Sequence, residues 1–230
     1  MLKRVIVAVG LAVLLIGTVW AAGDINTAAK FRARLRLKAN VYDTVLAPDS
    51  VLIRLTQEAC LTVSTEVGGY EKQFRVITAA GQAFYALQDS VVEVVSAVVV
   101  SNGLTKSIKA FYPQFWEDAG NADNLGTESG SEASPGGYII WDDSVEMLPV
   151  PVQVDTIYFK CFYEHPLIDD STDSVKLKSD YTLLAVDYAQ YLLYLVLKDY
   201  EQAVSWNGIY ENKAKKLIAK YTPKFDVAKQ

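Results

Sequence analysis

Apolar side chains recur at helical spacing toward both ends of the chain. Residues 24–42 place Ala28, Phe31 and Leu35 on one face, and although 31–37 also alternates like a strand, we favour a helix. A second helix follows Pro48, with Asp49 or Ser50 as the expected N-cap and Gly68-Gly69 as its end. Its apolar face consists of Val51, Leu55, Ala59 and Val63.

Two further helices are predicted at the C-terminal end. Ser179 and Asp180 are the expected caps of the first, and the second begins near Asp199. The apolar face of the first contains Leu184, Tyr188, Leu192 and Leu195. That of the second contains Trp206, Tyr210, Leu217 and Tyr221.

Between these helical parts the period changes to that of strands. β-Branched and aromatic residues dominate, and short turn signals such as 101–103 separate them. The expected strands include 74–78, 84–87, 91–100, 138–141, 145–148 and 156–163. The sequence therefore predicts an α+β protein: a helical bundle made from an N-terminal helix pair (24–72) and a C-terminal helix pair (167–230), with a β-sandwich or barrel-like insert (73–166).

The first 23 residues follow another pattern. Lys3 and Arg4 precede an apolar run from Val5 to Val19, and small residues follow at 21–23. This order is typical of a secretory signal peptide. A single anchor helix, a misassigned start and a buried helix remain alternatives, because the run is short for a membrane span.

Composition narrows the range of functions. The 230 residues carry a net charge of −5, which argues against a general nucleic-acid binder but allows a local basic patch. Two basic stripes occur at helical spacing, Lys30/Arg34/Lys38 and Lys213/Lys216/Lys220. They could face DNA or an acidic partner, or could be ordinary solvated helix faces.

Candidate catalytic residues are few. The single histidine, His165, lies four residues after Cys161, and we expect a strand-end histidine without a partner rather than a dyad. Cys60 and Cys161 could pair in an exported protein, but two buried free thiols are favoured. No catalytic residue, cofactor or metal site is predicted.

An acidic loop carries a partial calcium-site pattern. Asp169, Ser171 and Asp173 alternate as calcium ligands do, and Asp180 falls at the twelfth position. However, Ser174 stands where the sharp turn of such a loop needs glycine. The loop is therefore interpreted as solvated and acidic.

Aromatic residues are the stronger functional signal. The chain has 14 tyrosines, and those between 181 and 200 cover several faces of one predicted helix, so we expect some of them to form a protein interface. The candidate interface residues are Phe111, Tyr112, Phe115, Trp116, Tyr191 and Tyr194.

The order of segments resembles the head-to-tail adaptor, or connector, proteins of tailed bacteriophages. Residues 145–151 precede the aromatic strand 158–163, which leads through Glu164-His165-Pro166-Leu167 and an acidic loop to 177–181 and an Ala-rich helix pair. Residues 85–94 are similar to the family's Tyr-x-Leu-Pro-x-Asp strand opening, with Gln88 at the usual proline, and 178–181 lacks the proline of the family's helix start.

The resemblance implies a structural role without catalysis. Such subunits form a ring, often of twelve copies, beneath the portal, where they dock the tail and extend the DNA channel. It implies self-association, binding to portal and tail proteins, non-specific contact with packaged DNA, and a place in the virion. Because adaptors assemble in the host cytoplasm, a working signal peptide would instead indicate an exported periplasmic or cell-envelope protein without catalysis.

Overall fold

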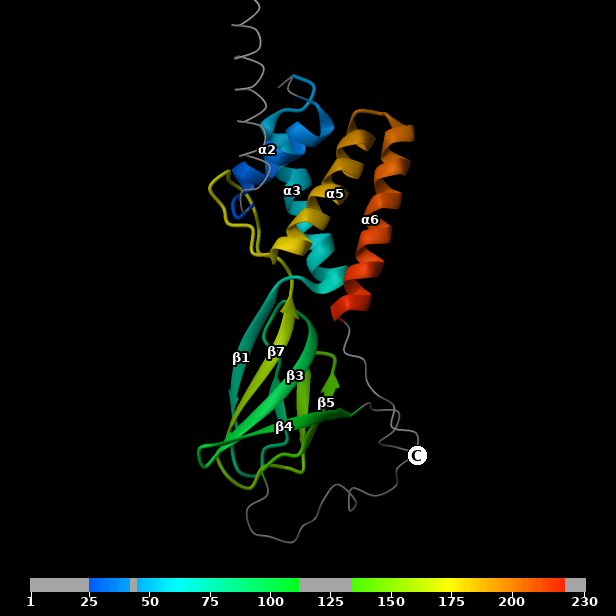
Figure 1. The fold of residues 1–230 in the computed structure, drawn as a ribbon. Coiled ribbons are helices and arrows are strands. Elements are labelled where there is room, and N and C mark those ends of the chain that lie inside the picture. Colours follow the sequence, from blue (N-terminus) through cyan, green and yellow to red (C-terminus); the bar gives the residue numbers. More distant parts are fainter. Residues whose placement is uncertain (1–24, 42–44, 112–133, 222–230) are drawn as a thin grey trace, which may run out of the picture. The chain divides into compact units, whose positions relative to one another are not determined.

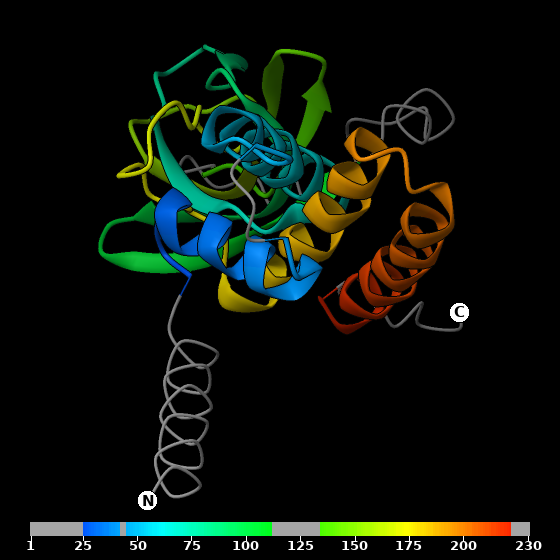
Figure 2. The same cartoon turned by 90° about the horizontal axis from the view of Figure 1, so that it is seen from above.

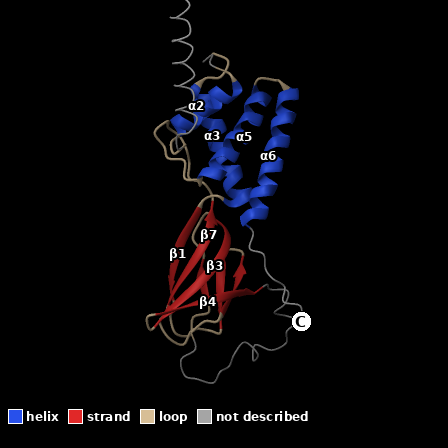
Figure 3. Cartoon of the chain, in the orientation of Figure 1, coloured by secondary structure: helices blue, strands red, loops and turns tan. Residues whose placement is uncertain are grey.

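The computed structural model describes residues 25–41, 45–111 and 134–221 of the chain. The expectations for residues 1–23 and for Tyr112, Phe115 and Trp116 lie outside these ranges. The chain divides into two compact units, a helical unit (1–67 and 165–230) and a β unit (68–164). Figures 1 and 3 show helices in one unit and strands in the other, so the protein is mixed α+β, as the sequence predicts.

The described helices of the helical unit are α2 (Ala28–Ala39), α3 (Asp49–Val63), α5 (Ser179–Val196) and α6 (Tyr200–Tyr221), and a short π-helix, Ser64–Gly68, continues α3. The helix favoured over 24–42 is thus confirmed as α2. The central helix is α5, which packs against α2, α3 and α6. Side chains along most of α5 are therefore buried, whereas one face of each neighbour is apolar.

Two of the expected helix caps are wrong by one residue. Helix α3 begins at Asp49, with Pro48 in the N-cap position, and α5 begins at Ser179, with Lys178 in that position. The Asp49 carboxylate has another partner, because it forms an ion pair with Arg36 of α2 at 2.9 Å. This contact joins the two N-terminal helices.

The β unit is one curled seven-stranded sheet, where we expected a sandwich or barrel-like insert. Its strands are β1 (Glu71–Ile77), β2 (Phe84–Ala86), β3 (Val91–Ser101), β4 (Leu104–Phe111), β5 (Gly137–Trp141), β6 (Ser144–Leu148) and β7 (Thr156–Tyr163), in the order β1-β7-β3-β4-β5-β6-β2. All neighbours are antiparallel except β4 and β5.

A tight hairpin joins β3 to β4. Asn102 and Gly103 both have positive φ, at 49° and 76°, which is the conformation of a two-residue type I′ turn. The core of the sheet is aromatic and aliphatic: Phe159 stacks on Phe74 with ring centroids 5.1 Å apart and meets Tyr138 edge-on. Among the described residues, no helix is both long and apolar enough to cross a membrane.

Candidate interface on the helical unit

A buried carboxylate lies between three helices of the helical unit. Asp187 of α5, whose side chain is 1% exposed, forms ion pairs with Lys38 of α2 and with Lys213 of α6, the latter at 2.5 Å. Burial lowers the pKa of Lys38, and the neighbouring charges of Lys213 and Arg34 lower it further, whereas Asp187 raises it. Three cations, Lys38, Lys213 and Arg34, thus lie near this single carboxylate.

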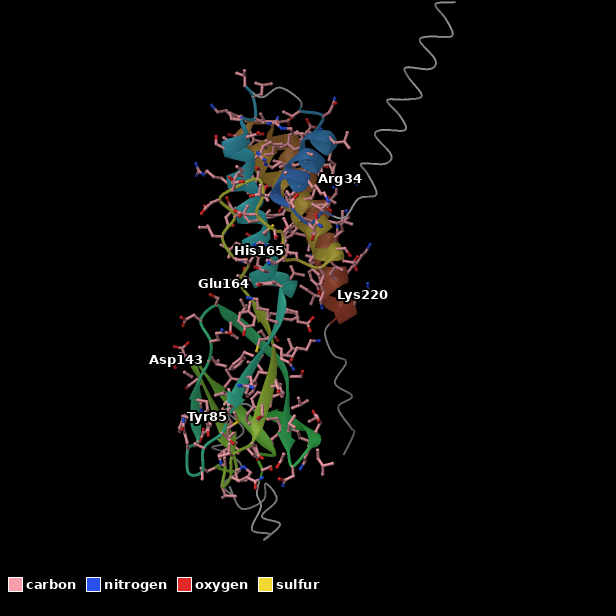
Figure 4. All side chains as sticks on the ribbon, turned by 90° about the vertical axis from the view of Figure 1, so that its left-hand side faces the viewer. Arg34, Tyr85, Asp143, Glu164, His165 and Lys220 are labelled. Carbon is pink, nitrogen blue, oxygen red and sulfur yellow. The ribbon has the colours of Figure 1, made fainter. Side chains whose placement is uncertain are left out.

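The two predicted basic stripes consequently meet along one side of α5. Lys220, seven residues after Lys213, pairs with Asp180 of α5 at 3.1 Å, and Lys216 lies on the same side of α6 between them. Figure 4 shows Arg34 and Lys220 on the same side of the helical unit. We call Arg34, Lys38, Lys213, Lys216 and Lys220 the basic seam; with Asp180 and Asp187 it has an excess of three positive charges.

The first residue of the α2 stripe is separate from the seam. Lys30 donates a hydrogen bond to Asn26 at 3.0 Å, near the start of α2. Two other side chains complete the seam: Trp206 of α6, whose ring centroid lies 4.5 Å from the Lys38 ammonium, and Leu183 of α5, which is 48% exposed. The basic seam therefore combines positive charge with an exposed apolar side chain, that of Leu183 on α5.

The acidic loop forms a compact turn. The Asp173 carboxylate accepts the N–H groups of Asp169 and Asp170, both at 2.8 Å, and the Asp170 carboxylate accepts the N–H of Thr172 at 2.8 Å. This last bond, with those from neighbouring hydroxyls, lowers the pKa of Asp170. The carboxylates thus organise their own backbone, and no cluster of three or more metal-ligating side chains occurs among the described residues.

The same turn covers the start of α2. The backbone N–H groups of Ala28 and Ala29 donate to the carbonyls of Asp173 and Ser171, both at 2.9 Å. These are donors that a helix start leaves without an intrahelical partner. The turn is therefore fixed to the helical unit, with Leu167, 66% exposed, just ahead of it.

Tyrosines of α5 contribute mainly to helix packing. Tyr191 is half-buried beside Tyr188, with ring centroids 5.6 Å apart, and Tyr188 packs on Tyr210 of α6. Tyr194 is also half-buried, and its hydroxyl donates to the carbonyl of Ala39 at 3.4 Å. Their role in assembly stays a prediction.

Phe111 belongs to the β unit. It is half-buried at the end of β4, where its ring lies against the Cα of Gly137 in β5. A Cβ at residue 137 would collide with this ring, so Gly137 allows the two strands to pair in parallel. The structure thus gives Phe111 a packing role, and an interface role for it remains a prediction.

His165 has partners, contrary to the expectation from sequence. Its ring Nε2 accepts the N–H of Lys176 at 2.8 Å, and Nδ1 lies 2.7 Å from the carbonyl of Pro166. Its backbone N–H donates to the Ser64 hydroxyl at 2.9 Å. Burial lowers the pKa of the imidazole. A neutral ring that accepts at Nε2 and donates at Nδ1 satisfies both contacts, so both ring nitrogens are used within the fold.

The two cysteines are free and buried, as expected. Burial raises the pKa of each thiol to about 12. Thiols with such values stay protonated near neutral pH and are poor nucleophiles.

Sequence reasoning missed the acid that joins the two stripes, Asp187. Asp187 interrupts the apolar run 184–189 of a predicted helix, and an acidic residue on a helix face expected to be buried is a usable signal of an ion pair. Its partner Lys38 is 149 residues away in the chain, so its identity could not be read from local spacing.

Comparison with known proteins agrees with the resemblance noted in the sequence. The search of curated proteins gives no match. The family model described as SU10 adaptor protein matches residues 26–226, which include all four described helices and the whole β unit. The chain therefore belongs to the SU10 adaptor protein family, in agreement with a phage head-to-tail adaptor.

Proposed function

We propose that this chain is a structural subunit of a ring that joins the portal of a phage head to the tail and extends the DNA channel. The family match over residues 26–226 is the observation that carries the proposal. Further copies of the chain, the portal protein and tail proteins are its partners in the virion, and packaged DNA is a non-specific contact.

The proposal assigns no catalytic role and no cofactor. In support, the reactive side chains that the structure describes are engaged in packing: both thiols are buried, and the imidazole of His165 is bonded on both nitrogens. Assembly is supported by α6, which exposes Val204 (73%) and Tyr200 (64%). Exposed apolar side chains on one helix favour burial against another chain.

Light scattering after size exclusion, followed by negative-stain imaging, tests the proposal. The purified chain should form rings by itself or on a purified portal ring. Bovine serum albumin in place of the portal controls for crowding. A chain that stays monomeric at high concentration, and remains so when mixed with the portal, contradicts the proposal.

A further inference from the structure

The helical unit presents surfaces of opposite charge on different flanks. In Figure 1 the segment that carries the acidic turn (yellow) lies to the left of α2 and α3, whereas α6 lies to the right, and Figure 2 shows the same separation from above. The acidic turn presents Asp169 and Asp170, whereas the basic seam lies along α5 between α2 and α6.

Each flank also places an exposed leucine beside its charges. Leu167, 66% exposed, lies two residues before Asp169. Leu183, 48% exposed, lies on α5 between Asp180 and Asp187, with the seam's cations on both sides. The two surfaces are thus complementary in two respects. Their charges are opposite, and each places an exposed leucine among its charged side chains.

A closed ring needs a contact of this kind. Rotational assembly joins one patch to a different patch of the next copy, so the two patches must lie on different flanks of one subunit and fit each other. Resting on the ring proposed above, we propose that the acidic turn of one copy docks on the basic seam of the next, with Leu167 against Leu183.

The residues of the basic seam favour carboxylates over DNA phosphates as the groups that bind to it. Asp187 and Asp180 show that its lysines bind carboxylate groups in the geometry they already have. A phosphate backbone would supply no apolar partner for Leu183, whereas the turn supplies Leu167. The turn is also held rigid by its own hydrogen bonds, so docking orders few additional groups.

Charge exchange between the flanks tests this contact. The seam variant carries Arg34→Glu and Lys216→Glu, which leaves the ion pairs of Asp180 and Asp187 in place. The turn variant carries Asp169→Lys, because Asp169 contributes its backbone N–H to the turn. Each variant alone should assemble at least about tenfold more weakly than the wild type, since like charges then face each other.

An equal mixture of the two variants should recover assembly. In alternating order, every substituted turn meets a substituted seam, so that a lysine faces glutamates, and every native turn meets a native seam. Unchanged circular dichroism and melting temperature show that each variant is folded. Lys198→Glu, on the α5–α6 connection, is a control for reversal of a single charge outside the seam and should assemble like the wild type.

Three results would overturn the contact. The first is normal assembly of each folded variant alone, and the second is a mixture that fails to recover. The third is a seam variant that assembles normally but loses affinity for a DNA duplex, which would assign the seam to DNA. All three leave the ring itself standing; a wild-type chain that never assembles, even on the portal, removes the ring and this contact together.

Discussion

The helical and β units differ in what they bury. Of the nine buried polar or charged side chains in the described residues, seven belong to the helical unit: Arg32, Thr56, Ser64, His165, Thr182, Asp187 and Gln190. The β unit has Thr78 and Asp155, which are bonded to each other through the Thr78 hydroxyl. Its remaining core is aromatic and aliphatic.

Backbone pairing explains this difference. In the sheet, ladder hydrogen bonds satisfy the backbone, while the alternation of apolar side chains and the tight turns set the register, so the core needs few buried polar side chains. Helices satisfy their backbone internally, and apolar contacts between them tolerate sliding. We infer that specific polar contacts, above all those of Asp187, fix how α2 and α6 pack on α5.

The largest effect is expected in the β unit. Phe159→Ala removes a fully buried ring that touches Phe74 and Tyr138, and should lower the free energy of unfolding by about 3–5 kcal/mol. Urea denaturation followed by circular dichroism measures this loss. Leu104→Ala, at a position 76% exposed, is the control and should stay within about 0.5 kcal/mol. Equal losses of stability in the Phe159→Ala and Leu104→Ala variants would show that the apolar core is not what mainly stabilises the sheet.

An intermediate effect is expected at the buried carboxylate. Asp187→Asn should lower the free energy of unfolding by about 2–3 kcal/mol. This is below the range for a fully buried pair, because the lysine partners are partly exposed and their ammonium groups can reach solvent. Asp180→Asn, on the same helix with an exposed lysine partner, is the matched control and should cost less than about 1 kcal/mol. Denaturation at low and high salt should find the larger loss at Asp187 in both conditions.

The smallest effect concerns pH. The pKa of His165 is lower in the folded chain than its ordinary value of 6.5, so the unfolded chain takes up the proton first as pH falls. The contribution of His165 to the free energy of unfolding is therefore fully present above about pH 6.5. As pH falls from there toward the folded-state pKa, it declines by at most about 1.4 kcal/mol per pH unit.

Comparison of denaturation at pH 7.5 and 5.5 checks this decline. Because the chain has a single histidine, His165→Gln should flatten the dependence whatever its own stability. A wild-type chain that is equally stable at pH 7.5 and 5.5 would show that the fold does not hold the imidazole of His165 neutral.

Local patterns predicted elements with one clearly buried face. Alternation predicted β7, in which Ile157, Phe159 and Cys161 are buried, and helical spacing predicted α3. Strand β4 was missed because only Ile108 of its eight residues is buried, which leaves no alternation to detect. The Asn102-Gly103 turn before it was the available signal, since this dipeptide is typical of tight hairpins.

The candidate interface was predicted in part. Helical spacing found both basic stripes, because residues three and four apart share a helix face. Their meeting on Asp187 depends on which helix packs beside which, and that follows from contacts 26 and 149 residues apart in the chain. Lys30, by contrast, fits the spacing of its stripe yet bonds to Asn26.

The position of the β unit within the chain has a consequence for synthesis on the ribosome. Residues 68–164 form a complete unit and emerge together, so the sheet can fold before α5 has been made. Helices α2 and α3 emerge earlier, but the helix that covers their apolar faces begins at Ser179. The apolar faces of α2 and α3 therefore lack the packing of α5 while the whole sheet is being translated, which makes this interval the one in which a chaperone has most to protect.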